Sequence, residues 1–164
     1  MTDFDRAIAF RPKFPEAYLN RGVTQDALGR YDRALADFDK AIELSPRNAL
    51  AHGNRARAYE KKGEPARAIA DWDRVIEFSP RSFEARVFRG RAHLATGDAD
   101  RAIADFDAAI QASARYAAAY NGRGEAYEKK GDRDRAIADH RRALLLDASL
   151  EASRIALKRL NAEP

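Results

Sequence analysis

The sequence has no cysteine, one tryptophan and one methionine among its 164 residues. Without cysteine the chain cannot form a disulfide framework, a thiolate zinc site or a cysteine nucleophile. No apolar run approaches the roughly 20 residues that a membrane-spanning helix needs, and no signal-peptide core follows Met1. These absences favour the cytoplasm, although they do not fix the compartment.

The short motifs that mark catalytic and cofactor sites are also missing. Neither G-x-S-x-G, nor a phosphate-binding glycine loop, nor H-E-x-x-H occurs. The three histidines, His52, His93 and His140, share no metal-ligand spacing and read better as substitutes for aromatic residues. The sequence therefore predicts that the protein is not an enzyme and has no catalytic residue, cofactor or metal.

No long block of one charge sign occurs either. The 30 basic and 26 acidic residues are interleaved and leave a formal net charge of +4. Interleaved charges are typical of a solvated, ion-paired surface, whereas a nucleic-acid site needs a basic patch. With 45% hydrophobic and 34% charged residues, the composition indicates a soluble, ordered protein, and the charge pattern disfavours nucleic acid as a partner.

A short phrase recurs along the chain at a fixed spacing. DRALADFDKAI begins at Asp32, and similar phrases begin at residues 66, 100 and 134. Glycines keep the same step of 34 residues, at Gly29, Gly63, Gly97 and Gly131. A fixed period of this size indicates an array of repeats, each of which buries its apolar face against its neighbours.

Each repeat reads as two antiparallel helices. In the second repeat, one helix covers 49–62 and ends before Gly63, and the next runs from near Pro65 to Phe78. The loop between them is short, which makes the pair antiparallel. Small residues recur inside the first helices, where we expect close helix packing: Gly22, Ala56, Gly90 and Gly124.

Two sets of charged residues repeat with the same period. We expect one set, of i, i+4 pairs, to lie on an exposed edge: Arg33–Asp37, Arg67–Asp71, Arg101–Asp105 and Arg135–Asp139. Asp37 and Asp39 point about 200° apart on a helix, so they cannot form a catalytic pair. In the other set we expect each guanidinium to cap a carboxylate or carbonyl of the adjoining helix: Arg21, Arg55, Arg89 and Arg123.

The order of small and aromatic residues resembles that of the tetratricopeptide repeat family. The first repeat shows the family's positions as Tyr18, Gly22, Gly29, Ala34, Phe38, Ala41 and Pro46. Some positions depart from the pattern, such as Gln25 and His93 in place of the usual tyrosine. The resemblance implies an all-α fold of nine or ten helices, a right-handed superhelical array of antiparallel helix pairs.

The repeats divide the chain into segments. We expect four repeats at 15–48, 49–82, 83–116 and 117–148, and a C-terminal cap helix with a tail at 149–164. DFDRAIAFRP at 3–12 aligns with DFDKAIELSP at 37–46, so 1–14 reads as the second helix of a preceding repeat in a chain that is a fragment or starts downstream. Its apolar residues, Phe4, Ile8 and Phe10, predict either self-association as a homodimer through the N-terminal end or packing back onto the first full repeat.

The resemblance places a binding groove on the concave side, along the first helices. Helical spacing assigns these residues to that face: Leu19, Asn20, Val23, Asn54, Arg57, Val87, Phe88, Arg91, Leu94, Asn121 and Glu125. Their apolar members imply anchoring of a partner, while Arg57 and Arg91 suit a carboxylate. The polar clamp that some members use for chaperone C-termini is not reproduced.

The best-supported function is therefore a protein–protein interaction scaffold. Its partner would be a peptide or helical segment with apolar anchors and an acidic group, bound in the groove. RNA binding by a helical repeat and self-association within a larger protein are the alternatives. A salt-dependent interaction with single-stranded RNA would favour the first of them.

Overall fold

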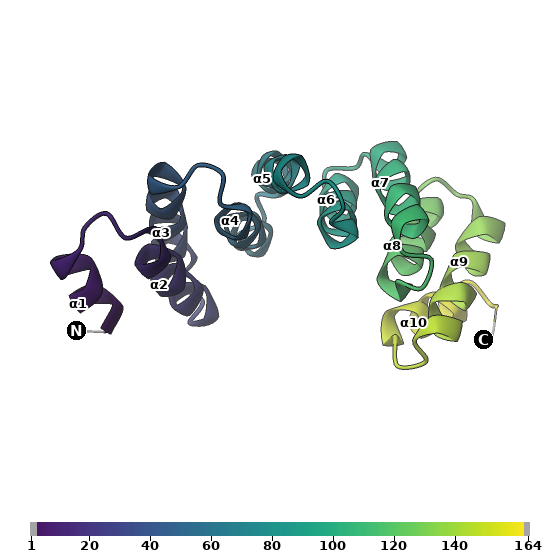
Figure 1. The fold of residues 1–164 in the computed structure, drawn as a ribbon. Coiled ribbons are helices and arrows are strands. Elements are labelled where there is room, and N and C mark those ends of the chain that lie inside the picture. Colours follow the sequence, from purple (N-terminus) through teal and green to yellow (C-terminus); the bar gives the residue numbers. More distant parts are fainter. Residues whose placement is uncertain (1–2, 163–164) are drawn as a thin grey trace. The chain divides into compact units, whose positions relative to one another are not determined.

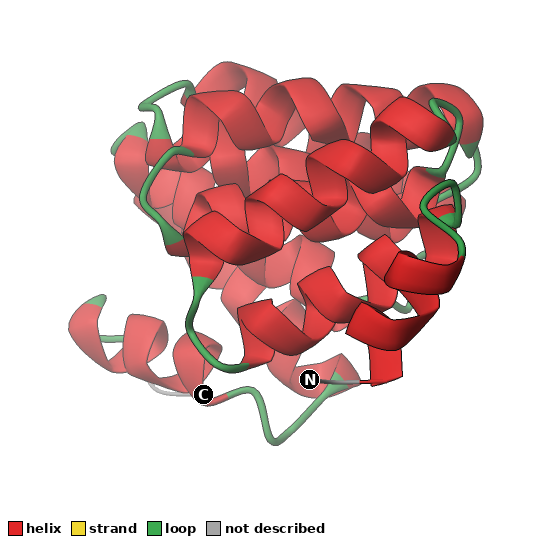
Figure 2. Cartoon of the chain, turned by 90° about the vertical axis from the view of Figure 1, so that its left-hand side faces the viewer, coloured by secondary structure: helices red, strands yellow, loops and turns green. Residues whose placement is uncertain are grey.

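The computed structural model describes residues 3–162, and these residues form ten helices and no strand (Figures 1 and 2). The predicted all-helical fold and the number of helices are confirmed. The chain divides into two compact units, Met1–Pro80 and Arg81–Pro164.

Each unit holds five helices. The first unit contains α1 (Asp3–Phe10), α2 (Pro15–Ala27), α3 (Tyr31–Leu44), α4 (Ala49–Lys61) and α5 (Pro65–Phe78). The second unit contains α6 (Phe83–Ala95), α7 (Ala99–Ala112), α8 (Ala117–Lys129), α9 (Arg133–Leu146) and α10 (Glu151–Arg159). The helices pack in sequential pairs: α2 with α3, α4 with α5, α6 with α7, and α8 with α9.

The helices end and begin at the glycines and capping residues of the sequence. Gly63 follows α4 with a φ of +74°, and Gly131 follows α8 with a φ of +77°. A residue with a side chain rarely adopts this left-handed conformation, so glycine ends each helix at the predicted place. At the other end, the side chains of Asn48 and Ser82 accept hydrogen bonds from backbone amides in the first turns of α4 and α6.

The core of each unit depends on a ring packed against a small residue. Phe38 in the first unit and Phe106 in the second are 0% exposed. A Cβ atom added at Gly22 would lie 2.6 Å from Cε1 of Phe38, and one at Gly90 would lie 2.9 Å from Cε1 of Phe106. The close approach predicted for the small residues of the first helices is therefore confirmed.

Candidate functional site

The arginines that repeat along the first helices bind aspartates of the adjoining helix. Arg21 donates from Nε and Nη2 to the two carboxylate oxygens of Asp37, at 2.9 and 2.6 Å. The other bidentate pairs are Arg55–Asp71, Arg89–Asp105 and Arg123–Asp139. A guanidinium fork matches a carboxylate in this geometry. The predicted capping of carboxylates is confirmed.

Arginines of this set also reach a carboxylate on the second helix of the repeat before. These contacts are Arg21–Asp5 at 2.8 Å, Arg55–Asp39 at 2.7 Å and Arg123–Asp107 at 2.5 Å. Neighbouring aspartates such as Asp37 and Asp39 thus bind different arginines. The set ties successive repeats together within each unit and is structural.

The prediction that the i, i+4 pairs lie on an exposed edge is wrong for their aspartates, which are buried. Asp37 is 6% exposed and Asp71 is 2% exposed. Arg33, one turn before Asp37, lies exposed, and the partner of Asp37 is Arg21 on the adjoining helix. A bidentate pair across two helices is a stronger contact than an exposed i, i+4 pair, which explains the difference.

These contacts also affect the arginines. The hydrogen bond with Asp37 raises the pKa of Arg21 further above its ordinary value, although partial burial opposes the change. Asp71 raises the pKa of Arg55 in the same way, and burial again opposes it. These contacts therefore favour the charged form of both guanidinium groups.

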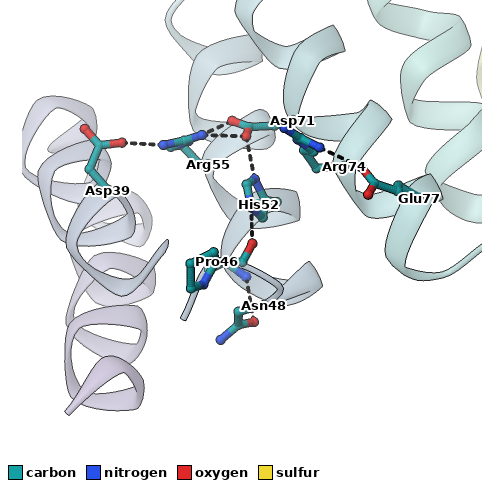
Figure 3. A network of polar contacts seen from close by, with 9 residues as sticks. Asp39, Pro46, Asn48, His52, Arg55, Asp71, Arg74 and Glu77 are labelled. Carbon is teal, nitrogen blue, oxygen red and sulfur yellow. Dashed lines mark hydrogen bonds and ion pairs between the residues drawn. The ribbon is translucent and has the colours of Figure 1, made fainter. Parts of the chain in front are cut away.

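The histidines occupy packed positions rather than a metal site. His52 is 5% exposed; its Nδ1 lies 2.8 Å from Oδ1 of Asp71 and its Nε2 lies 3.1 Å from the carbonyl oxygen of Pro46 (Figure 3). His140 is 0% exposed, and its Nε2 lies 3.0 Å from Glu128. Within residues 3–162 no group of three or more His, Asp or Glu side chains is placed to hold a metal ion.

Trp72 and His140 are the two rings of this repeated position that carry a nitrogen, and the sequence analysis assigned neither of them a hydrogen-bond partner. Each has a glutamate 12 residues earlier in the chain. Nε1 of Trp72 donates to Glu60 at 2.7 Å, as His140 contacts Glu128. Of the two phenylalanines at the same position, Phe106 has the apolar Leu94 12 positions before it, whereas Phe38 has Asp26. Because an acidic residue also precedes Phe38, the spacing alone does not identify these contacts from the sequence.

The predicted binding face is partly covered in the first unit. Leu19 is 8% exposed, so it belongs to the core and is not a free anchor. Asn20, Val23 and Arg57 are exposed, with Val23 at 42%. Asn54 is half-buried and donates from its amide to the carbonyl oxygen of Leu50 at 2.9 Å. The accessible part of this face is therefore Asn20, Val23 and Arg57.

In the second unit two further members of the face are buried. Val87 is 1% exposed and shares a core cluster with Ala119 of α8. Asn121, 34 residues later, is 4% exposed and accepts a hydrogen bond of 2.7 Å from Ser153 of α10. Their assignment to the binding surface is wrong, because α8 covers Val87 and the cap helix α10 covers Asn121.

The remaining predicted residues of the second unit include two beside a surface hollow. Leu94 and Glu125 line a cavity of about 590 Å³ together with Glu128, Lys129 and Arg159. Arg159 of α10 donates to both carboxylate oxygens of Glu128, at 2.8 and 2.7 Å. The sequence reading missed the α10 contribution, because the cap helix shows no spacing rule that brings Arg159 to α8.

Two other members of the predicted face in this unit lie outside the lining of the cavity. Arg91 is exposed and Phe88 is half-buried. Both are on α6, as is Leu94. The structure thus places an apolar, a cationic and an anionic group of the predicted face on the surface of one unit.

The three apolar residues of α1 differ in exposure. Phe10 is 91% exposed, whereas Phe4 and Ile8 are half-buried. Helix α1 contacts α2, and Asp5 on α1 binds Arg21. Helix α1 therefore packs against α2 on one side, and its Phe10 side chain is exposed to solvent. Self-association through this end stays a prediction.

No helix within residues 3–162 is both long enough and apolar enough to span a membrane.

Sequence and structure comparisons agree on the kind of repeat. Family models described as tetratricopeptide repeat match residues 15–48, and residues 54–117 and 89–151. A crystal structure of MamA is 26% identical with a TM-score of 0.83, and the match covers 88% of this chain and 85% of that chain. No curated protein matches the chain in sequence.

Two further solved structures are similar. One is TTC0263, a thermophilic TPR protein of Thermus thermophilus, with 29% identity, a TM-score of 0.74 and coverage of 90% of this chain and 81% of that chain. The other is MamA of Desulfovibrio magneticus, with 20% identity, a TM-score of 0.83 and coverage of 90% and 84%. The latter likeness is one of fold.

Proposed function

Because the chain belongs to the tetratricopeptide repeat family, whose repeats generally serve as protein-interaction modules, we propose that it binds a peptide or helical segment of a partner protein and is not an enzyme. The contact surface is the accessible part of the first-helix face in each unit. In the first unit it consists of Asn20, Val23 and Arg57, and in the second of Phe88, Arg91, Leu94 and Glu125.

The observation that carries the proposal is the contrast between two sets of arginines on the same helices. Arg55 and Arg89 are bound to aspartates of their own units. Arg57 and Arg91, two positions further along, are exposed and have no hydrogen bond, ion pair or ring contact within residues 3–162. An unpaired guanidinium on an interaction face suits a carboxylate of a partner.

Apolar side chains of the same predicted face support the same kind of partner. In the first unit Val23 is 42% exposed, and in the second unit Leu94 lines the hollow. Apolar groups in a surface hollow are anchors for protein segments. The partner segment therefore combines apolar residues with at least one acidic residue.

A selection from a random peptide library tests this proposal. Displayed peptides of about 16 residues are selected on the immobilised full chain, and the enriched ones are synthesised and titrated by fluorescence anisotropy. The enriched peptides are expected to combine apolar residues with Asp or Glu. The double variant Arg57→Ala, Arg91→Ala is expected to bind them at least about 10-fold more weakly, which corresponds to about 1.4 kcal/mol.

The matched control is the double variant Arg33→Ala, Arg115→Ala. Both of these arginines are exposed, lie outside the proposed face and have no hydrogen bond, ion pair or ring contact within the described part of the chain. The control therefore removes two positive charges, as the test variant does, without removing a polar contact. It is expected to keep the wild-type affinity. Equal affinity of the Arg57/Arg91 variant and the wild type, with unchanged circular dichroism, would show that the partner binds elsewhere.

A further inference from the structure

A surface cavity of the first unit lies beside the arginine–aspartate contact of α2 and α3. Its volume is about 340 Å³, which is within the range of small-ligand pockets. Helices α1, α2 and α3 supply its lining, which consists of Asp5, Arg21, Gln25, Arg33, Ala36 and Asp37. None of these residues belongs to the first-helix face proposed above as the protein contact, so the cavity is a separate site.

The six lining positions recur in later repeats with one change. Their equivalents in the second repeat are Asp39, Arg55, Tyr59, Arg67, Ala70 and Asp71. Those in the fourth repeat are Asp107, Arg123, Tyr127, Arg135, Ala138 and Asp139. The first repeat therefore keeps the residues that accompany the tyrosine, but it has Gln25 in place of the tyrosine itself.

In the second and fourth repeats a buried tyrosine ring lies under the arginine of this set. Tyr59 is 5% exposed, and Cζ of Arg67 lies 4.1 Å from the centre of its ring. Tyr127 is 9% exposed, and Cζ of Arg135 lies 4.4 Å from the centre of its ring. A guanidinium over an aromatic face at this distance makes a cation–π contact.

The charges around Tyr59 match those that line the cavity. Burial raises the pKa of the Tyr59 hydroxyl, Arg55 and Arg67 lower it, and Asp39 and Asp71 raise it. One repeat earlier, the equivalents of these four charged residues are Arg21, Arg33, Asp5 and Asp37. The cavity thus lies where the first repeat would hold a tyrosine ring.

Two groups in the lining lack the contacts that a ring would give them. Arg33 is exposed and has no hydrogen bond, ion pair or ring contact within residues 3–162, whereas Arg67 and Arg135 lie over rings. Oε1 of Gln25 is buried and has no hydrogen-bond partner within the same residues. The cavity therefore combines an unstacked guanidinium with an acceptor that lacks a donor.

We propose that this cavity binds a phenol group from outside the chain, in the place that Tyr59 and Tyr127 fill in their own repeats. The ring would stack on the guanidinium of Arg33, and the hydroxyl would donate to Oε1 of Gln25. Two sources have this chemistry, a tyrosine of another polypeptide and a free phenolic compound. A folded second copy has no exposed tyrosine to offer, since all six tyrosines of the chain are buried or half-buried.

A titration with p-cresol, which is the side chain of tyrosine as a free molecule, provides the direct test. The probe is added to the isotope-labelled full chain, and the NMR signals of the Gln25 side-chain amide and of Nε–H of Arg33 are followed. We expect saturable shifts with a Kd on the order of 1 mM, as suits a ligand of this size. Methylcyclohexanol, which has the hydroxyl but no aromatic face, is expected to bind about 2- to 5-fold more weakly.

Two variants of the lining identify the site. Gln25→Tyr is expected to abolish p-cresol binding, because its own ring fills the cavity, and to raise the midpoint of thermal unfolding by about 4 °C. Arg33→Gln keeps the cavity without the cation and is expected to weaken binding about 2- to 5-fold. The charge-matched control is Lys13→Gln, an exposed lysine of the same unit without a contact in the described residues, and it is expected to bind as the wild type does.

A tyrosine-containing peptide distinguishes the two sources of the phenol. The probe is the capped peptide Gly-Gly-Tyr-Gly-Gly, titrated in the same way. If it binds at least as tightly as p-cresol, the site accepts a tyrosine of a polypeptide. If p-cresol binds and the peptide does not, the site holds a free phenolic compound.

The cavity and the first-helix face can fail independently. The double variant Arg33→Ala, Arg115→Ala is expected to keep its affinity for peptides selected on that face, while its affinity for p-cresol falls as it does for Arg33→Gln. A loss of both would show that the two sites are one.

Three results would overturn the proposal. One is the absence of saturable shifts up to about 10 mM p-cresol. Another is equal affinity for p-cresol in the wild type, Gln25→Tyr and Arg33→Gln, with unchanged circular dichroism. The third is a dimer in light scattering at about 100 μM that Gln25→Tyr converts to a monomer, since a second copy would then fill the cavity.

Discussion

Two glycines of the first unit lie inside helices, and replacing each by alanine is expected to change stability in opposite directions. At Gly53 an added Cβ would lie 3.4 Å from Cζ3 of Trp72 and 3.7 Å from Cγ2 of Val75. These are close to ordinary van der Waals distances, and alanine favours a helix by about 1 kcal/mol over glycine. Gly53→Ala is therefore expected to stabilise the first unit by about 0.5–1 kcal/mol.

Gly22→Ala has the same helical gain but a steric cost. The new Cβ would lie 2.6 and 2.8 Å from two ring carbons of Phe38, and 3.2 Å from the carbonyl oxygen of Ala34. Phe38 is 0% exposed, so its ring has no free space to enter. Overpacking of this kind costs about 1–3 kcal/mol, and after the helical gain the net loss is expected to be about 1–2 kcal/mol.

The assay uses the single tryptophan of the chain, Trp72, which lies on α5 in the first unit. Urea unfolding followed by its fluorescence reports that unit, and far-UV circular dichroism of the same samples reports all helices. Because Gly53→Ala touches the indole ring, the urea midpoint is compared rather than the emission intensity. A midpoint that rises for Gly22→Ala, or falls for Gly53→Ala, would refute the packing argument.

Two further changes test polar contacts in the second unit. Arg123→Ala removes the hydrogen-bond donors of Asp139, whose side chain is 9% exposed and has no other partner within residues 3–162. The expected loss is about 2–4 kcal/mol, measured as a lower thermal midpoint, and an unchanged midpoint would contradict it. Ser153→Ala leaves the buried Oδ1 of Asn121 without its donor, at a cost of about 1–2 kcal/mol. Adding Asn121→Val is expected to restore most of that loss, because an apolar pair stands at this place one repeat earlier; a further loss would argue against it.

Much of the fold is encoded in local patterns. The period of 34 residues, the glycines after the first helices and the prolines near helix starts all act within a few residues of the chain. For this reason α4 and α5 lie at the predicted bounds to within one residue. The small residues of the first helices also predicted close helix packing correctly. Glycine inside a helix lowers helix stability, and close packing is the reason for its recurrence there.

The charges could be placed on a helix from the sequence but not assigned to partners. Arg33 lies one turn before Asp37 on the same helix, so helical spacing predicted that these two residues form a pair. In the folded unit, Arg21 from α2 reaches Asp37 with two hydrogen bonds. The bidentate geometry requires the register between two helices, which no spacing within one helix specifies.

The candidate binding face shows the same limit. Helical angles placed Leu19, Val87 and Asn121 opposite the core of their repeats, yet all three are buried. Helix α8 covers Val87, where Ala119 meets it in the core, and the cap helix α10 covers Asn121, where Ser153 donates to it. The exposed members, such as Arg57 and Arg91, follow the same angles without being covered.

The sequence by itself determined the repeat, the helices, the family and the residue types that alternate along each helix. The tertiary structure decided which flank of each first helix stays open and which aspartate each arginine binds. It also showed that Asp3 and Phe4 lack the contacts made by Asp37 and Phe38. The reason is that periodicity gives the direction of a side chain from its own helix axis, whereas burial and pairing depend on the distance and rotation of the neighbouring helix.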